Sequence, residues 1–328
     1  MADESAVGLP DAPDAAVAPA TWIERAPDAA WCPAGLLTAL DAASIDAASQ
    51  EPGTLSLVTR EWHVRGASVR GRSHGHRGEY RDDALAGNVD GHLLVLAVAD
   101  GAGSSALSRI GAAVTAQLAV DRTIARFVTD GANTDATARL GTAMAHAVHD
   151  AAVRLHELAT IGGVSPTALR TTVIVVAIAG ETMLVSQVGD GAVLIRRTDG
   201  SVVRVGAQRE TAWAGEVTCF VPDACAMTQA AALRQLRASD VALIALMTDG
   251  VDDPFHPLEQ SGAALVSQWM HGTTAPIGTA KQQTLGPVLN DAMALVNWLA
   301  FEQRGEVDDR TLLLAWRPDA VRAGAVPS

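Results

Sequence analysis

Three aspartates in the sequence stand at the ends of apolar runs, and each is next to a glycine. The runs are residues 92–99 before Asp100-Gly101, 183–188 before Gly189-Asp190-Gly191, and 241–247 before Thr248-Asp249-Gly250. Apolar runs of this length that end at glycine are typical of buried strands. A carboxylate just past the end of a strand is held at a sheet edge, and the glycine lets another group approach the backbone closely. The pattern therefore predicts acidic side chains positioned for ligand binding.

Further carboxylates lie at the predicted joints between strands and loops. They are Asp82, Asp83, Asp252, Asp253, Asp308 and Asp309. Carboxylates that face one another raise each other's pKa, so a convergent set favours hard divalent cations between its members. Mg²⁺ and Mn²⁺ take oxygen ligands, and two such ions about 3.5–4 Å apart clamp a phosphoryl group and activate a water. Asp-Gly is also a common turn pair, and spacing alone leaves both interpretations open.

Composition argues against several classes of function. The chain of 328 residues has a formal net charge of −13. Nucleic acids and anionic membranes both need clustered Lys and Arg, so neither is an expected partner. No signal-like segment opens the chain, and no apolar stretch approaches the ~18 residues of a membrane span. Cys32, Cys219 and Cys225 form no CxxC pair, which argues against a disulfide framework and a structural zinc site. We expect a cytoplasmic protein.

The order of predicted elements indicates one globular domain, over 55–317, between two tails. Residues 1–54 are expected to be disordered or partly helical because Ala, Asp and Pro dominate their first part, and residues 318–328 to be a frayed tail. We predict strands at 62–71, 92–99, 171–179, 183–188, 192–197, 201–205, 241–247 and 311–316, a polar loop at 72–83, a helix capped by Ser104 or Ser105, helices over 134–159 and 256–303, and a flap at 206–239. Hairpin strands mixed with long helices are typical of an α+β layered fold with mostly antiparallel strands.

Several short motifs occur in an order that resembles a known family. They are Gly71-Arg72-Ser73-His74, Asp82-Asp83-Ala84, Val98-Ala99-Asp100-Gly101-Ala102-Gly103-Ser104, Thr171-Thr172, Val188-Gly189-Asp190-Gly191, Thr248-Asp249-Gly250-Val251 and Asp308-Asp309-Arg310-Thr311. Together they resemble the metal-dependent protein phosphatases of type 2C, the PPM family, and most of all its bacterial branch. The resemblance implies a four-layer α-β-β-α sandwich of two mainly antiparallel sheets flanked by helices, with a binuclear Mn²⁺ or Mg²⁺ site in a cleft at one end.

The resemblance also implies which residues hold the two ions. Asp83 would bridge both ions, Asp100 would bind the first and also bridge, and Gly101 would offer the first ion its backbone carbonyl. Asp249 and Asp308 would bind the second ion. A water between the ions would attack phosphorus in line, without a covalent intermediate, and the substrate would be a phosphorylated serine/threonine protein. Members of the bacterial branch are often encoded beside a protein kinase, so a cognate Ser/Thr kinase is an expected partner.

Other matching positions surround the ions. Asp82 takes the position of a neighbour that holds water, and Asp309 replaces the amide that is usual at its position. Asp253 matches a ligand of a third, weaker ion, whereas Asp190 matches a turn that we interpret as structural. His74, in the loop before Asp83, is the candidate general acid toward the leaving oxygen; a loop histidine bonded to backbone is the alternative.

The chain departs from the family pattern where the phosphate would bind. Many members carry an arginine five residues before the bridging aspartate, and this chain has Gly78 there, so Arg77 or Arg81 is the candidate phosphate ligand. The second carboxylate for a third ion is replaced by residues 168–170. These departures support an alternative function, a catalytically weak or inactive phosphatase fold that binds a phosphoprotein or kinase partner. A nucleotide site at the Gly103 loop is a third hypothesis, which the hairpin-rich middle of the chain disfavours.

Overall fold

The computed structural model describes residues 25–27, 31–40, 45–46, 49, 52–129, 135–206, 219–272, 287–289, 291–301 and 305–319. Most of the predicted N-terminal tail, the first part of the predicted flap and residues 320–328 lie outside these ranges. Within them, no helix is long and apolar enough to cross a membrane.

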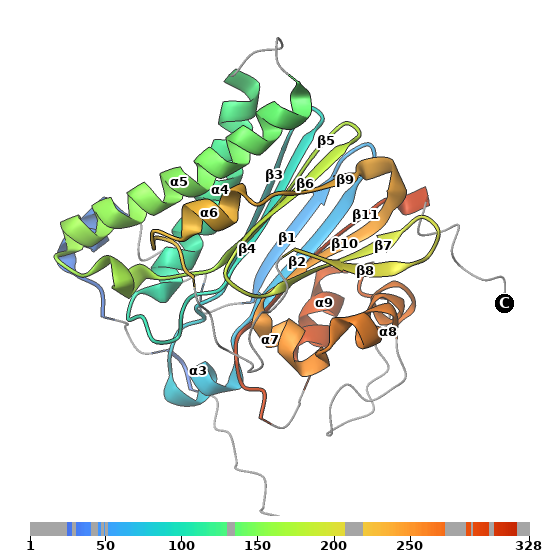
Figure 1. Ribbon diagram of the computed structural model, residues 1–328. Helices are drawn as coiled ribbons and strands as arrows, with labels where there is room; N and C mark the ends of the chain where they lie inside the picture. Colours follow the sequence, from blue (N-terminus) through green and yellow to red (C-terminus); the bar gives the residue numbers. More distant parts are fainter. Residues whose placement is uncertain are drawn as a thin grey trace, which may run out of the picture.

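Two antiparallel sheets form the centre of the molecule (Figure 1). One sheet has six strands in the order β1-β2-β11-β10-β7-β8, and the other has five in the order β3-β4-β5-β6-β9. The strands are β1 (Gly53–Val58), β2 (His63–Val69), β3 (Ala84–Asp90), β4 (Leu93–Ala99), β5 (Val173–Ala179), β6 (Thr182–Val188), β7 (Ala192–Arg197), β8 (Val202–Val205), β9 (Arg234–Arg237), β10 (Val241–Met247) and β11 (Arg310–Trp316). Every pairing between neighbouring strands is antiparallel.

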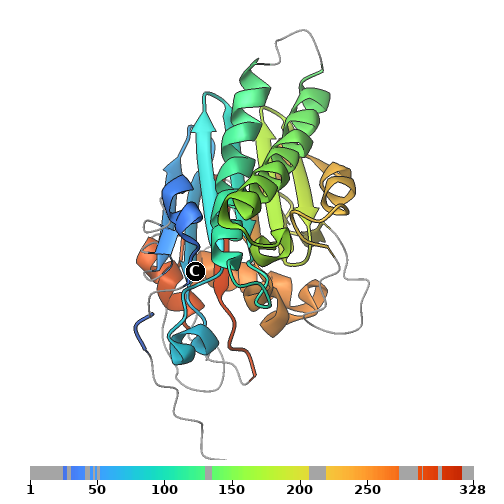
Figure 2. The ribbon, with the colours of Figure 1, turned by 90° about the vertical axis from the view of Figure 1, so that its left-hand side faces the viewer.

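Helices cover the outer face of each sheet. The long helices α4 (Ser108–Thr129) and α5 (Ala136–Gly162) lie side by side over the five-stranded sheet (Figure 2), with α1 (Ala34–Ala39) packed on α5. Helices α8 (Leu258–His271) and α9 (Ala292–Leu299) share a core with the six-stranded sheet. The predicted four-layer α-β-β-α sandwich is therefore confirmed, with one core between the sheets and one under each helical layer.

The apolar run that ends at Asp100 shows why these segments become strands. Leu94, Leu96 and Val98 point into the core between the sheets. The alternate residues Val95 and Ala97 point into the core under α4 and α5. Side chains of a strand alternate between its two faces, so a strand buried on both faces needs an unbroken apolar run. This packing holds the end of β4, and the residue that follows it, in a fixed position.

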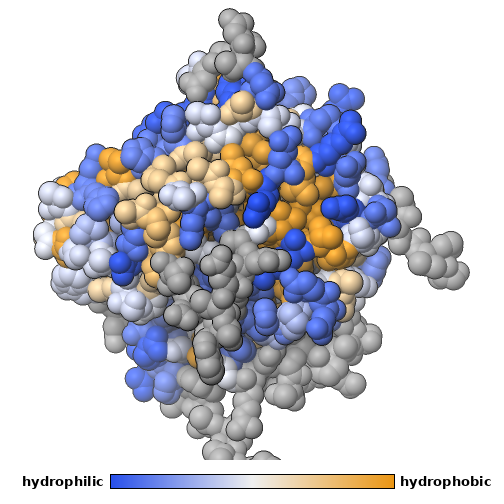
Figure 3. Space-filling view, viewed as in Figure 1, coloured by the Kyte–Doolittle hydropathy of each residue, from blue (hydrophilic) through white to orange (hydrophobic). Residues whose placement is uncertain are grey.

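At the edge formed by β8 and β9 the core between the sheets approaches the surface. Figure 3 shows apolar side chains gathered there, among hydrophilic neighbours. Val203, Val205 and Leu236 are partly buried at this edge and pack against the core between the sheets.

Several local predictions were wrong. Residues predicted as a polar loop contain the short helix α3 (Arg72–Arg77), and the helix after Asp100 begins at Ser108, after a turn, so Ser104 and Ser105 do not cap it. The described part of the predicted flap contains α6 (Ala226–Ala231) and strand β9. These elements are short or carry charged residues, so hydrophobic periodicity does not reveal them.

The cysteine pattern argued against a disulfide framework, but the structure contains one disulfide. Cys219 and Cys225 form a disulfide whose Cα atoms are 6.0 Å apart. The two cysteines are six residues apart in the sequence, and the turn between them brings their side chains together, which a search for CxxC spacing does not detect. Cys32 is a free thiol.

Candidate metal centre

The loops that carry the predicted acidic residues meet at one end of the sandwich. Strand register explains this arrangement. Ala84 pairs with Ala99, Val173 with Val188, Met247 with both Ala192 and Leu312, and Arg310 with Val69. In one sheet the starts of β3 and β5 therefore lie beside the ends of β4 and β6, and in the other sheet the starts of β7 and β11 lie beside the end of β10. Each predicted strand-end carboxylate follows or precedes one of these positions.

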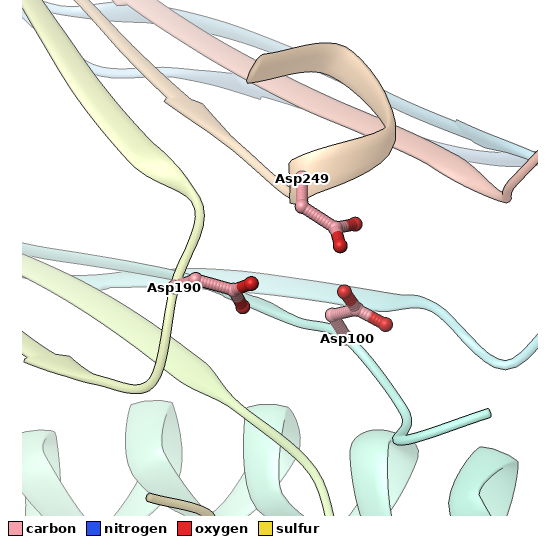
Figure 4. Close-up of side chains that lie close together, drawn as sticks. All are labelled: Asp100, Asp190 and Asp249. Carbon is pink, nitrogen blue, oxygen red and sulfur yellow. The ribbon is translucent and has the colours of Figure 1, made fainter. Parts of the chain in front are cut away.

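Three carboxylates from separate loops point toward one another (Figure 4). Asp100 follows β4, Asp190 lies in the turn between β6 and β7, and Asp249 begins the short helix α7 (Asp249–Asp252) after β10. Each offers an oxygen, and these three atoms lie within 4.8 Å of one another. All three aspartates are partly buried. We expected Asp190 to lie in a purely structural turn, but its side chain belongs to the cluster. The sequence signal for this role was the third Asp-Gly pair, Asp190-Gly191.

Asp83 lies deeper and joins the two sheets. Its side chain is only 3% exposed. Thr248 Oγ1 and Thr311 Oγ1 both donate to Asp83 Oδ2, at 2.8 and 2.7 Å. Asp83 precedes β3 of one sheet, whereas the two threonines belong to the ends of β10 and β11 in the other. These hydroxyl groups orient the carboxylate, and neither threonine was among the predicted site residues.

Burial and mutual repulsion raise the pKa values of these carboxyl groups. The pKa of Asp83 rises to about 8, chiefly through burial and then through the charge of Asp309, against the two hydroxyl donors. Burial and the neighbouring Asp249 hold the pKa of Asp100 well above its usual range. Burial and then Asp190 do the same for Asp249. Such a set keeps protons that a bound cation would displace.

A second acidic group, Asp309, organises the segments beside the cluster. It is 2% exposed and accepts hydrogen bonds from the backbone N–H groups of Gly71 and Asp82, at 2.6 and 2.5 Å. His74 Nδ1 lies 2.9 Å from Asp309 Oδ1. The start of α3 and the segment before β3 are therefore both tied to the loop before β11.

His74 and Asp82 both contact Asp309 and also lie close to each other. His74 Nε2 lies 3.9 Å from Asp82 Oδ2, and Ser108 Oγ donates to the same oxygen at 2.8 Å. Burial alone lowers the pKa of His74, but contact with Asp309 and the charge of Asp82 raise it to about 9. Burial and Asp309 raise the pKa of Asp82 to about 6. At neutral pH the imidazole is a cation that could donate a proton.

A cleft of about 510 Å³ opens over the carboxylate cluster. Its lining includes Asp100, Gly101, Asp249 and Asp308, together with His74. Asp308 is exposed at the rim. A side chain at Gly101 would meet Asp82 O and Ser108 Cβ at 2.8 Å, so only glycine fits this position.

The two candidate phosphate ligands occupy different environments. Arg77 is exposed at the cleft, where its Nε lies 2.5 Å from Glu79 Oε2 and its guanidinium donates to Ser73. Arg81 is 5% exposed, and its guanidinium donates to the backbone carbonyls of Ser68 and Asp83, each at 3.1 Å. Arg81 therefore supports the backbone under the site, whereas Arg77 faces the cleft.

Two further features surround the cleft. Asp253 lies in a 3₁₀ turn (Asp253–Phe255). The pKa of Glu306 is raised, first by the burial of Glu306 and second by the negative charge of Asp253. Next to the cleft is a chamber of about 670 Å³ that shares His74 and Arg77 with it and extends to Tyr80. The two spaces therefore share part of their lining beside α3.

The donor set fits hard divalent cations. Asp100, Asp190 and Asp249 supply only carboxylate oxygens, which Mg²⁺ and Mn²⁺ prefer and which soft metals do not. The raised pKa values of Asp100 and Asp249 indicate a site whose negative charge lacks compensation. A cation would supply that compensation.

Comparison with known proteins assigns the family. The sequence matches the family model of protein phosphatase 2C over residues 70–290. The chain therefore belongs to the protein phosphatase 2C family, and the resemblance inferred from the motifs is confirmed. No curated protein matches the sequence.

Solved structures share the fold at low sequence identity. A bacterial serine phosphatase is 14% identical with a TM-score of 0.54, over 77% of this chain and 97% of that one. The serine/threonine phosphatase Stp1 from Staphylococcus aureus is 14% identical with a TM-score of 0.53, over 80% and 97%. A sex determining protein of C. elegans is 16% identical with a TM-score of 0.56, over 82% and 68%. At these identities the likeness concerns the fold alone.

Proposed function

We propose that this chain is a metal-dependent serine/threonine phosphoprotein phosphatase that hydrolyses phosphomonoesters at a binuclear Mn²⁺ or Mg²⁺ site. The observation that carries the proposal is the convergence of Asp100, Asp190 and Asp249 in a protein phosphatase 2C fold, beside a cleft that Asp100 and Asp249 line. Family membership supports the class of reaction, and the oxygen-only donor set supports the class of metal.

The residues proposed to hold the two ions are Asp83, Asp100, Asp249 and Asp308, with the Gly101 carbonyl, and Asp190 is added to them by its position. Asp253 remains the candidate for a weaker third ion. When bound, such ions supply Lewis acidity toward the phosphoryl group and a water of lowered pKa. Thr248 and Thr311 keep the buried Asp83 carboxylate in one orientation.

Protein groups on the other side of the cleft would handle the phosphate and the leaving group. Arg77 would contact the phosphoryl oxygens, because an exposed guanidinium at the cleft is suited to them. His74 would hold the proton for the departing serine or threonine oxygen, and Asp309 would keep the imidazole charged and oriented. Asp82, fixed by Ser108, would hold water beside the ions.

The substrate class follows from the proposed reaction. We propose a phosphorylated serine or threonine in a protein as the substrate and a Ser/Thr kinase as the enzyme that supplies it, within bacterial signalling. The experiment is hydrolysis of phosphoserine, phosphothreonine and phosphotyrosine peptides by the metal-free chain, with and without added Mn²⁺ or Mg²⁺. We expect turnover of the first two peptides that appears with the metal and disappears with a chelator.

One observation favours the alternative function, phosphoprotein binding without turnover. Arg81 is withdrawn into backbone hydrogen bonds, and the guanidinium of Arg77 already contacts Glu79. The peptide experiment separates the two functions if peptide binding is measured in the same samples. Metal-dependent phosphate release supports the phosphatase, whereas tight peptide binding with no release at any metal concentration supports the binder.

A further inference from the structure

The disulfide closes a short loop, residues 219–225, at the wall of the cleft. Cys219 is 1% exposed, and Phe220, the next residue, lines the cleft. The Asp223 N–H donates to Phe220 O at 2.7 Å, which makes a tight turn within the loop. Helix α6 begins directly after Cys225. The loop thus has one end in the core and one side in the cleft.

A ladder of backbone bridges joins this loop to the proposed metal ligands. The N–H of Thr171 donates to Val221 O at 3.0 Å, and the N–H of Val221 donates back to Thr171 O at 2.8 Å. Thr171 in turn forms an antiparallel bridge with Gly101. Val221 and Thr171 are both 0% exposed, so the ladder is shielded from water.

Thr171 and Thr172 also hold the backbone of Asp100 directly. Thr171 Oγ1 and the N–H of Thr172 both donate to Asp100 O, each at 2.8 Å. The N–H of Asp100 donates to Thr172 Oγ1 at 3.2 Å. Asp100 is therefore held through both its N–H and its C=O by residues 171–172. Thr171 is in turn hydrogen-bonded to Val221 of the disulfide-closed loop.

A second contact ties the same two segments together. Arg170 Nε lies 3.0 Å from Asp223 Oδ1, and the Arg170 guanidinium lies over the Phe220 ring at 5.8 Å. Both side chains of this ion pair are partly exposed, so the pair is screened by solvent and contributes little by itself. The disulfide is the covalent part of the support.

We propose that the Cys219–Cys225 loop is a positioning element for Asp100 and Gly101, and that reduction of its disulfide weakens metal binding at the cleft. The inference rests on the proposed function for the identity of the metal site, but the loop and its ladder do not depend on it. Groups that orient metal ligands typically affect metal affinity by about 10- to 100-fold. Because this support acts through Thr171, we expect an effect near the lower end, about 10-fold.

The reduction itself needs a dithiol. Its thiolate attacks one sulfur of the disulfide, a mixed disulfide forms, and its second thiol displaces the protein thiol. The protein gains two electrons and two protons as two cysteine thiols, and the dithiol becomes a cyclic disulfide. Loss of the covalent closure leaves the loop held only by its hydrogen bonds and packing, which increases its conformational freedom.

Hydrogen exchange tests the positioning without any metal. The full chain is compared in its oxidised form and after reduction by dithiothreitol, with thiol titration to establish the redox state and circular dichroism to establish that both forms are folded. We expect faster exchange after reduction at the N–H groups of Thr171, Thr172 and Val221, and unchanged exchange in β10. Equal exchange rates of these three amides in both forms would overturn the inference.

Calorimetric titration with Mn²⁺ tests the consequence. We expect the dissociation constant to rise about 10-fold on reduction, and a Cys219→Ser/Cys225→Ser double variant to behave like the reduced protein under both conditions. A Cys32→Ser variant is the matched control and should respond to reduction as the natural chain does. Equal Mn²⁺ affinity in the oxidised and reduced chains would contradict the proposal. If the oxidised chain binds no Mn²⁺ at all, the proposed function fails, and hydrogen exchange still decides whether the loop positions Asp100.

Discussion

The two sides of the cleft are built in different ways. The carboxylate side consists of strand ends, and its deepest member, Asp83, receives two hydroxyl hydrogen bonds from the opposite sheet. The other side consists of the six-residue helix α3 and an exposed arginine whose partners are Glu79 and Ser73. The carboxylates are fixed by the core of the molecule. On the other side, buried contacts with Asp309 tie α3 to the loop before β11, but the arginine itself is held only by contacts that solvent screens.

This difference separates two kinds of residue at one site. Groups that must converge on a cation need positions that do not relax, because carboxylates brought together repel one another. Groups that contact a changing substrate can lie on a short element at the surface. We therefore expect substitutions on the carboxylate side to abolish metal binding or destabilise the fold, and substitutions of Arg77 to change substrate affinity alone.

The largest expected effect comes from Asp249. Asp249→Asn removes one of the charges that favour a cation, and we expect kcat/KM for a phosphoserine peptide to fall at least about 100-fold, since even outer partners of metal ligands change affinity by 10- to 100-fold. Calorimetry should show the matching loss of Mn²⁺ binding. Asp199→Asn is the control, because Asp199 also precedes a glycine at a strand end but caps the exposed β7–β8 turn through Ser201. Full activity in Asp249→Asn would mean that the cluster is not the catalytic site.

The threonines test whether the carboxylate side is built into the core. Thr311→Val keeps the shape of the side chain and deprives Asp83 of one buried donor, which we expect to lower the free energy of unfolding by about 2 kcal/mol. Urea denaturation of the metal-free chain measures it. Thr115→Val is the matched control, because Thr115 is equally buried and its hydroxyl has no hydrogen-bond partner among the described residues. The interpretation fails if the two substitutions have the same effect on stability.

The two arginines separate the sides of the cleft most directly. We expect Arg77→Gln to lower kcat/KM about 10-fold through KM, because one charge-assisted contact with phosphate is lost, and to leave stability within about 0.5 kcal/mol. Arg81→Gln should lower the free energy of unfolding and leave KM nearly unchanged, since Arg81 donates to buried backbone carbonyls. Peptide kinetics and urea denaturation on both variants give the comparison. If Arg81→Gln raises KM more than Arg77→Gln does, Arg81 and not Arg77 contacts the phosphate.

The carboxylate side could be predicted from the sequence because strand ends are visible in it. Long apolar runs mark β4 and β10 as strands buried on both faces, and the residue after such a run has little freedom. Asp100 and Asp249 were found in this way. Asp190 was interpreted as structural because its turn is a common one. It lies beside Asp249 because the chain passes there from β6 in one sheet to β7 in the other, and the start of β7 pairs with the end of β10.

The rest of the site depends on contacts between distant segments. The hydroxyls of Thr248 and Thr311 reach Asp83 because two sheets pack face to face, and nothing in local sequence indicates that packing. Helix α3 has no apolar stripe, so it is invisible to periodicity. The Cys219–Cys225 pair likewise follows from a turn geometry that six residues of sequence do not specify.

The last expected effect is a dependence of stability on pH that the metal reverses. Asp83 titrates with a pKa of about 8 in the folded metal-free chain, against about 3.9 when unfolded. Between these values the folded state holds a proton that the unfolded state has released, so the free energy of unfolding falls as pH rises, by at most about 1.4 kcal/mol per pH unit for one proton. His74, with a pKa of about 9, contributes with the same sign above pH ~6.5.

Urea denaturation in chelator at pH 5.5, 6.5 and 7.5 should therefore give decreasing stability, and saturating Mn²⁺ should remove or invert the trend, because the ion binds the deprotonated carboxylates. Asp83→Asn cannot release the proton, so its metal-free stability should depend less on pH, whereas the exposed Asp199→Asn should follow the natural chain. If the metal-free natural chain becomes more stable from pH 5.5 to 7.5, the carboxylates are already ionised in the folded state. It would then be wrong that the carboxylates repel one another in the metal-free chain, and the contrast drawn between the two sides of the cleft would fail.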